Sequence, residues 1–336
     1  MRVGVMGASG YVGSELLRLA SEHPDMEIVA ASAETNAGAL VASHVPALAG
    51  LYPETRFVSN AEFEEVGLDV AFIALPHGKS QDVVPGLLER GVRVVDLGAD
   101  FRLRDAQDYP TWYHDEHRAP ALLEKAVYGL VERHRDELKG APLIAVPGCF
   151  PTATALAFGP FIDAGVLDEG TLVVTALTGA SGAGRAISDR LHFSRMAGNA
   201  EAYGLLHHRH TAEMQQELGR RVLFTPHLVP VSRGMLVSAF APVRDLTSDA
   251  ALEMLRESYQ NDPFVVVLDE PPALKDPLGS NLCFVSARVD ARTSTLIVMS
   301  SLDNLVKGAA GQAVQAWNVS RGVDETTGLS RAGLTP

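Results

Sequence analysis

A cysteine at position 149 stands directly before a stretch with the pattern of a helix start. It lies in the run VPGCFPTAT (residues 146–154), where the proline at 151 suits a first helical turn because its missing N–H has no partner to lose. The dipole at a helix start stabilises a thiolate. We therefore predict that Cys149 is a nucleophile. The alternative is a thiol that packs as a small hydrophobe, which we expect for Cys283 in the strand-like run 281–285.

The densest group of histidines is the segment HHRHTAE, residues 207–213. A cysteine that attacks an acyl carbon needs a neighbouring acid/base, and imidazole is the usual one. We predict this role for His210 or His208, between which the spacing does not decide. The segment could instead be a solvated helix start or a metal site, but only Glu213 adds another ligand type, so we predict no metal.

Three arginines lie where loops could bind an anion such as an acyl phosphate. Arg102 follows the strand-like run 92–96, Arg185 ends the glycine-rich run SGAGR, and Arg233 lies in PVSRG. The carboxyl ends of parallel strands and glycine-rich turns both bind anions. The alternative for each is an ordinary surface arginine.

The loop GASGYVG, residues 7–13, links a short apolar run to an amphipathic stretch. At such a strand-to-helix turn, backbone N–H groups and the helix dipole can hold a pyrophosphate. We predict that a nicotinamide cofactor binds there, at Gly7, Ser9, Gly10, Tyr11, Val12 and Gly13. At the end of the next strand Ser32 could donate to a 2′-phosphate and Glu34 would repel one, so the choice between NAD and NADP stays open.

The elements that must position these residues change character along the chain. Strand-like runs alternate with helix-like stretches at first, which predicts a doubly wound parallel sheet of Rossmann type in residues 1–148. Strand-like runs with few helices then predict a mostly antiparallel α+β domain in residues 149–303. The expected strands are 3–6, 28–31, 70–75 and 92–96 in the first part and 172–178, 222–226, 235–242, 264–268, 281–289 and 294–301 in the second.

Composition excludes several classes of protein. A net charge of −13 disfavours a nucleic-acid partner, and two distant cysteines form no disulfide framework. The chain has no apolar run long enough to span a membrane and no signal-peptide pattern, so we predict a cytoplasmic protein. A cysteine nucleophile combined with a nicotinamide cofactor predicts interconversion of acyl groups and aldehydes through a thioester.

Ordered motifs over nearly the whole chain resemble the N-acetyl-gamma-glutamyl-phosphate reductases of arginine biosynthesis, which are related to the aspartate-semialdehyde dehydrogenases. The matching segments are residues 7–13, 74–78, 100–102, 147–152, 181–185, 208–211, 226–234 and 304–313. The cysteine segment and the lysine-glycine segment at 307–308 are specific, whereas the first glycine loop is shared much more widely.

The resemblance implies a reaction and further site residues. NADPH would bind the first domain, and Cys149 would displace phosphate from N-acetyl-glutamyl 5-phosphate to form a thioester that hydride reduces to the semialdehyde. Cofactor contacts would extend to Pro76, His77, Ser181, Gly182 and Asn304, and substrate contacts would come from Arg102, Arg185, Arg209 and Arg233. The family fold also returns residues 304–336 to the first domain and forms homodimers or homotetramers.

Two features depart from the family pattern: the second strand ends without a basic residue for NADP, and Phe158 replaces a smaller aliphatic residue. Three other activities are alternatives. A carrier-linked aminoadipate phosphate reductase of lysine biosynthesis would have Asn-Ala where this chain has Phe150-Pro151, and an acidic carrier would be repelled by the acidic chain. Aspartate-semialdehyde dehydrogenase and a non-catalytic cofactor sensor are the remaining alternatives.

Overall fold

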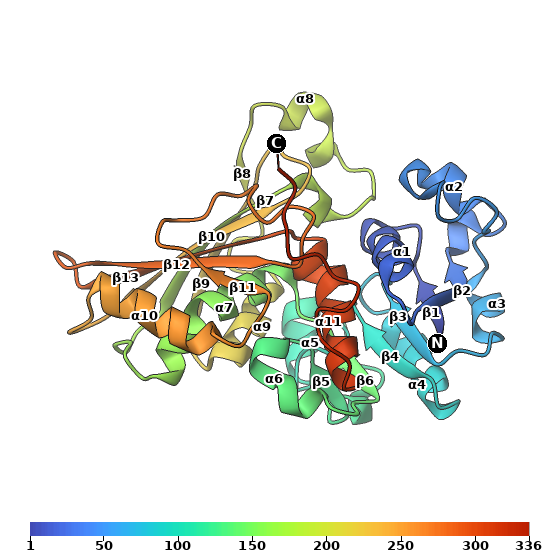
Figure 1. Cartoon of the computed structure of the whole chain (residues 1–336), viewed down its shortest axis with the longest axis horizontal. Coiled ribbons are helices and arrows are strands. Elements are labelled where there is room, and N and C mark those ends of the chain that lie inside the picture. Colours follow the sequence, from blue (N-terminus) through green and yellow to red (C-terminus); the bar gives the residue numbers. More distant parts are fainter. Residues whose placement is uncertain (336) are drawn as a thin grey trace. The chain divides into compact units, whose positions relative to one another are not determined.

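The computed structural model describes residues 1–335, which form two compact units (Figure 1). The first unit comprises Met1–Pro147 and Ala309–Leu329, and the second comprises Gly148–Gly308 and the described residues from Ser330 onward. The boundary between the two units falls after Pro147, one residue before the expected boundary after residue 148. Residues 304–336 were expected to belong to the first unit, but only Ala309–Leu329 do so. Just outside this range, Asn304 Oδ1 accepts a hydrogen bond from Gly234 N–H (2.8 Å) and Ser330 O accepts one from Asn281 N–H (2.9 Å), both within the second unit.

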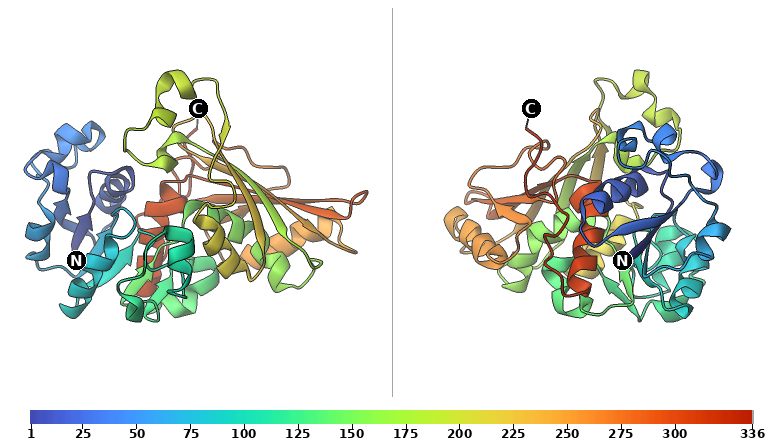
Figure 2. Two further views of the ribbon diagram at one scale, coloured as in Figure 1. Left: turned by 180° about the vertical axis from the view of Figure 1, so that it is seen from behind. Right: turned by 45° about the vertical axis from the view of Figure 1, so that its right-hand side comes forward.

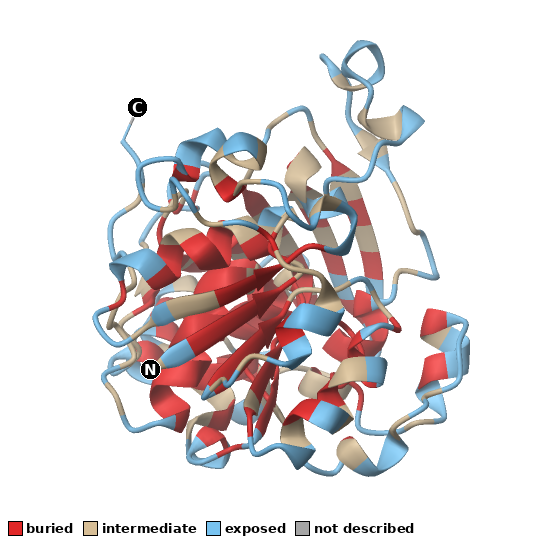
Figure 3. Ribbon diagram, turned by 90° about the vertical axis from the view of Figure 1, so that its right-hand side faces the viewer, coloured by how far each residue is buried: buried red, intermediate tan, exposed pale blue. Residues whose placement is uncertain are grey.

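The first unit is built on a six-stranded parallel sheet, as the alternating pattern predicted. Its strand order is β2-β1-β3-β4-β6-β5. The four residues of β3 are all buried, which is the pattern of a strand covered on both faces (Figure 3). The strands are β1 (Arg2–Met6), β2 (Glu27–Ser32), β3 (Val70–Ile73), β4 (Arg93–Asp96), β5 (Ala126–Tyr128) and β6 (Leu143–Ala145).

The helices of the first unit follow these strands in the chain, apart from the last one. α11 comes after the whole second sheet in sequence, yet it packs on α6 and on β4. A five-residue π-helical turn, Val306–Ala310, leads into it. The helices are α1 (Tyr11–Glu22), α2 (Val41–His44), α3 (Asn60–Glu64), α4 (Ser80–Glu89), α5 (Asp108–Tyr113), α6 (Val131–Leu138) and α11 (Gly311–Ser320).

The second unit is built on a seven-stranded mixed sheet in the order β11-β12-β13-β10-β7-β9-β8. Its central pairs, β12 with β13, β13 with β10 and β10 with β7, are antiparallel. The predicted fold class is confirmed in both units. The strands are β7 (Leu172–Thr178), β8 (Glu201–Ala202), β9 (Val222–Leu228), β10 (Met235–Pro242), β11 (Val265–Val267), β12 (Cys283–Asp290) and β13 (Thr295–Leu302).

One face of this second sheet is covered by helices α7 (Cys149–Asp163), α9 (His210–Leu218) and α10 (Ser248–Tyr259) (Figures 1 and 2). α7 is the central one: Phe158 and most of its other residues are fully buried, so the large side chain at 158 is a packing feature. The other face is less covered. Between β7 and α9 the chain makes an excursion that contains the short helix α8 (Phe193–Met196).

Candidate active site

Cys149 is the first residue of α7, as the sequence pattern predicted for a nucleophile. Gly148 is the N-cap with extended backbone angles, and Thr152 N–H donates to Gly148 O (3.0 Å) to close the first turn. The thiol is partly exposed and lines a cavity of about 210 Å³ in the second unit. The sulfur therefore combines access to a ligand with the positive end of a long buried helix.

His210 is the first residue of α9 and lies against the glycine that precedes the cysteine. A Cβ atom at position 148 would lie 2.5 Å from His210 Nε2, so only glycine permits this approach. Glu213, one turn further along α9, is fully buried and accepts a hydrogen bond from Gly148 N–H (2.7 Å). The two helix starts that carry the thiol and the imidazole are thus joined directly.

His208 lies in the same cavity but in a different electrostatic situation. Burial, followed by the charges of Arg209 and His207, lowers the pKa of the His208 imidazole to about 4. Its Nδ1 accepts a hydrogen bond from the backbone N–H of His210 (3.2 Å), and its ring packs edge-on against Phe150, with centroids 5.6 Å apart. His208 is therefore neutral at physiological pH and supports the start of α9.

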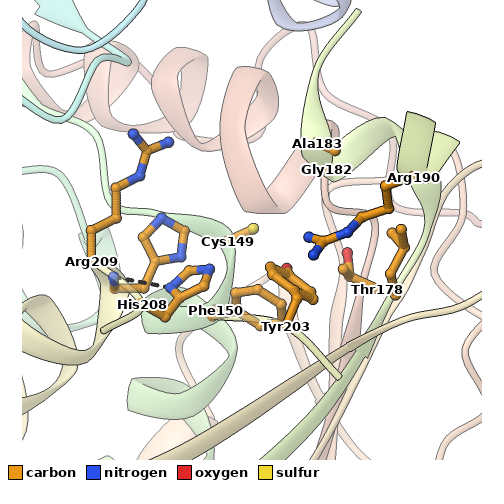
Figure 4. A pocket seen from close by; sticks show the side chains of 11 residues that line it. Cys149, Phe150, Thr178, Gly182, Ala183, Arg190, Tyr203, His208 and Arg209 are labelled. Carbon is orange, nitrogen blue, oxygen red and sulfur yellow. Dashed lines mark hydrogen bonds between the residues drawn. The ribbon is translucent and has the colours of Figure 1, made fainter. Parts of the chain in front are cut away.

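The cavity brings together Cys149, His208, His210, Arg209 and Gly182 of the predicted residues, along with side chains that the sequence analysis missed (Figure 4). Thr178, Arg190 and Tyr203 are the polar members that were missed. Thr178 ends β7, whereas Arg190 and Tyr203 come from the excursion between β7 and α9, in which no motif marks them. Burial raises the pKa of Tyr203 above its ordinary value, and the charge of Cys149 adds to this effect, so the tyrosine remains a neutral hydrogen-bond donor.

The other predicted residues of the second unit lie outside that lining. Asn304 bridges two segments, because its Nδ2 donates to Ser181 Oγ (3.0 Å) while its Oδ1 accepts from Gly234 N–H. Arg233 Nη1 lies 3.5 Å from Oδ2 of the buried Asp303, and Arg185 is exposed. Among residues 1–335, no group of three or more His, Cys, Asp or Glu side chains has the arrangement of a metal site.

The glycine loop lies between β1 and α1 in the first unit, at the carboxyl ends of β1 and β2. The N–H groups of Gly7 and Ala8 donate to Ser32 O (3.1 and 2.8 Å), which fixes the loop next to β2. A Cβ atom on Gly13 would collide with the backbone of Gly7, so the tight turn requires a glycine there. The side chain of Ser32 is buried and its Oγ donates to Asn60 Oδ1 (2.8 Å).

A second group of loops lies at the carboxyl ends of β3 and β4. The fully buried Asp100 carboxylate accepts hydrogen bonds from Gly78 N–H (2.7 Å) and Ser80 N–H (2.9 Å), and its Oδ1 lies 2.7 Å from His77 Nδ1. Although burial opposes ionisation, the hydrogen bonds from His77 and Gly78 hold the pKa of Asp100 below its ordinary value. Pro76 is exposed beside this network.

Arg102 and Asp96 belong to the same edge of the sheet. The Arg102 side chain is buried and its Nη2 donates to Leu97 O (2.9 Å). Burial raises the pKa of Asp96 to about 7, and the charge of Asp100 contributes to the rise, while Ser80 Oγ donates to Asp96 Oδ1 (2.7 Å). The predicted anion-binding arginine thus lies next to a carboxyl group that is half protonated near neutral pH.

The comparisons with known proteins assign both units to one superfamily. Residues 2–141 match the family model described as semialdehyde dehydrogenase, NAD binding domain, and residues 149–304 match semialdehyde dehydrogenase, dimerisation domain. N-acetyl-gamma-glutamyl-phosphate reductase of Symbiobacterium thermophilum is 44% identical over 99% of this chain and 98% of its own length. The enzyme of that name from Pseudomonas fluorescens strain Pf0-1 is 41% identical over the full length of both chains.

The chain belongs to the N-acetyl-gamma-glutamyl-phosphate reductase family. The predicted resemblance is therefore confirmed, and the first unit carries the NAD(P)-binding domain of this family. Solved structures of aspartate-semialdehyde dehydrogenases share the fold. The probable enzyme from Pseudomonas aeruginosa aligns with a TM-score of 0.70 and 21% identity, covering 95% of this chain and 98% of that one. The NADP complex from Candida albicans aligns with a TM-score of 0.66 and 19% identity, covering 95% and 97%.

No helix among residues 1–335 is both long enough and apolar enough to cross a membrane.

Proposed function

We propose that the protein reduces N-acetyl-glutamyl 5-phosphate to N-acetyl-glutamate 5-semialdehyde and phosphate, with NADPH, in arginine biosynthesis. The observation that carries this proposal is the single cavity in which a thiol at the start of α7 lies with imidazoles from the start of α9. Family membership supplies the substrate, because the relatives that align over the full chain carry this name.

The chain's own residues account for the covalent steps. The Cys149 thiolate attacks the acyl carbon, the C–O bond to phosphate breaks, and a thioester remains on the sulfur. The bound nicotinamide supplies a hydride to that carbon. The resulting thiohemiacetal oxygen is stabilised by a proton held at the imidazole, and its collapse breaks the C–S bond to release the aldehyde and regenerate the thiolate.

His210 is the acid/base of this proposal. The ring lies directly against Gly148, the residue before the nucleophile, and Glu213 holds α9 in place there. His208 is a positioning residue, since its low pKa keeps it neutral and its Nδ1 is engaged by the His210 backbone. The proposal thus assigns the acid/base role to His210, where the spacing left both histidines open.

NADP is the proposed form of the cofactor. An NAD-binding site would use an acidic side chain at the end of β2 to bind the ribose diol. Here the candidate, Glu34, is engaged in a local hydrogen bond: its Oε2 accepts from Asn60 N–H (2.9 Å). Thr35 and the amide of Asn36 follow as potential phosphate donors, with Asn36 Nδ2 donating to Thr35 Oγ1 (3.2 Å).

A homodimer formed through the second unit is part of the proposal, and a homotetramer would add further contacts to it. On the sheet face opposite α7, residues at alternate positions of β7 and β9 remain open to solvent: Val173 is 40% exposed and Leu223 is 46% exposed. Apolar residues on such a face favour burial against a second copy. A cytoplasmic location is consistent with the proposed pathway.

The decisive assay follows NADP⁺ reduction in the presence of N-acetyl-glutamate 5-semialdehyde and phosphate. Aspartate semialdehyde and the carrier-linked aminoadipate semialdehyde serve as substrate controls, NAD⁺ as the cofactor control and Cys149→Ala as the variant. Turnover of the acetylated substrate that needs Cys149 and prefers NADP⁺ is expected. Faster turnover of either control substrate would reassign the substrate, and a preference for NAD⁺ would overturn the cofactor proposal alone.

A further inference from the structure

The cavity that holds Cys149 contains a guanidinium group to which neither motif nor family resemblance gave a role. Arg190 belongs to the short 3₁₀ turn Asp189–Leu191, in the excursion between β7 and α9. Figure 4 shows its side chain reaching into the cavity toward the Cys149 sulfur, from the side opposite His208. The guanidinium of Arg209, the other arginine of the lining, lies on the His208 side of the cavity in this view.

Two neighbours hold Arg190 in this orientation. Its Nη2 lies 3.3 Å from Glu201 Oε1, and its guanidinium carbon lies 5.3 Å from the centroid of the Tyr203 ring. A guanidinium supported by an aromatic face and a carboxylate has fewer rotamers to lose when it binds a ligand. Arg190 is therefore preorganised toward the interior of the cavity.

The charge around Arg190 suits an anion. Arg195 Nη2 also lies 3.5 Å from Glu201, so two guanidinium groups share one carboxylate and leave one positive charge in excess. A carboxylate matches the planar fork of a guanidinium in bidentate geometry. The cluster thus offers a substrate carboxylate a charged and planar partner.

We propose that Arg190 binds the α-carboxylate of the substrate and so selects N-acetylated amino-acid substrates over uncharged acyl compounds. This inference rests on the proposed function, because N-acetyl-glutamyl 5-phosphate carries one carboxylate, which three carbons separate from the acyl carbon that Cys149 attacks. Cys149 and Arg190 would hold the two ends of the substrate chain. Tyr203 positions the guanidinium and offers a neutral hydroxyl beside it.

The test removes the substrate carboxylate and the Arg190 guanidinium separately and together. The substrate N-acetyl-glutamate 5-semialdehyde is compared with 4-acetamidobutanal, which is the same molecule without the α-carboxylate. Each is assayed with NADP⁺ and phosphate on the unmutated protein and on Arg190→Ala. Arg195→Ala is the matched control, because it removes the same charge from the same Glu201 partner at a residue that does not line the Cys149 cavity.

The unmutated protein should prefer the carboxylated aldehyde by roughly 10- to 100-fold in kcat/KM, mostly through KM, as for a hydrogen bond to a charged group. Arg190→Ala should lose that preference and leave 4-acetamidobutanal unaffected. Arg190→Lys should recover part of it, because lysine restores the charge without the fork. Arg195→Ala should keep the preference.

Different failures have different meanings. If Arg190→Ala slows both aldehydes equally, or raises the KM of phosphate instead, Arg190 does not recognise the carboxylate and the inference is wrong while the proposed function stands. If the unmutated protein does not oxidise N-acetyl-glutamate 5-semialdehyde at all, the proposed function fails and this inference fails with it.

Discussion

In the first unit a ligand would meet mainly the backbone of loops at the carboxyl ends of parallel strands, and buried carboxylates such as Asp100 hold these loops in place. In the second unit a ligand would meet side chains on the first turns of two helices. The first arrangement depends on backbone N–H groups and tolerates many side chains, provided that no Cβ atom fills the loop. The second depends on the identity of individual side chains. Catalytic and cofactor functions should therefore respond separately to substitutions in the two units.

The largest expected effect comes from Gly148→Ala. The new Cβ would lie 2.5 Å from His210 Nε2, so the imidazole must move away from the cysteine. We expect kcat to fall by roughly 10²- to 10³-fold, as when an acid/base is displaced, with little change in the Kd of NADPH. Stopped-flow assays and fluorescence titration of NADPH measure the two quantities. An equal loss of cofactor affinity would contradict the separation of the two units.

Asp96→Asn tests the buried carboxyl groups of the first unit. Because burial raises the pKa of folded Asp96 to about 7 from 3.8, the folded chain keeps a proton between these pH values that the unfolded chain has lost. The free energy of unfolding therefore falls as pH rises through this range, by about 2–3 kcal/mol between pH 5 and pH 8 from this group. Asp96→Asn should lose this pH dependence of the free energy of unfolding.

Urea-unfolding midpoints of both proteins at pH 5 and pH 8 provide the measurement for Asp96. Asp96→Asn should gain stability relative to the unmutated protein as pH rises. Parallel pH dependence in the two proteins would show that Asp96 is ionised in the folded state at both pH values.

Gly13→Ala places a methyl group against the backbone of Gly7 in the cofactor loop. We expect the Kd of NADPH to rise about tenfold, the cost of a local overpacked contact. The rate of Cys149 alkylation by iodoacetamide should stay unchanged. Gly86→Ala is the matched control, since it lies in α4 of the same unit with nothing within 4 Å of the added Cβ. If Gly86→Ala weakened NADPH binding equally, the loop would have no special role.

His208→Asn should have the smallest effect, a loss of about fivefold in kcat, because one hydrogen bond to the His210 backbone is altered. The apparent pKa of the acid limb in the kcat profile should stay in place, since His208 is neutral above about pH 4. His210→Asn, in contrast, should remove that limb. If the apparent pKa of the acid limb shifted in His208→Asn, His208 and not His210 would be the acid/base.

The sequence pattern predicted both sheets because long buried runs and alternating runs differ visibly, and the segment 235–242 matches β10 residue for residue. β5 and β6, of three residues each, and the two-residue β8 were missed. Cys149 could be found from its helix-start motif. Arg190 and Tyr203 could not, because only the tertiary path of the excursion brings them to the cavity.

The side-chain contacts of the cofactor loops also depend on tertiary structure that the sequence pattern did not predict. Ser32 stays a predicted donor to a 2′-phosphate, and its buried hydroxyl donates here to Asn60 Oδ1, a residue 28 positions away, a contact that the sequence pattern did not predict. The choice between His208 and His210 likewise depends on burial and on the contact with Gly148, neither of which is encoded in the spacing of a His-Arg-His segment.

The close contact between His210 and Gly148 also has a stereochemical consequence. With the imidazole against the residue before the cysteine, the thiol is open to a ligand through the cavity that it lines. In the oxidative direction, a planar aldehyde carbon that enters through this cavity, with its carboxylate directed to Arg190, presents one of its two faces to the sulfur. The thiohemiacetal that forms from it then has a single configuration.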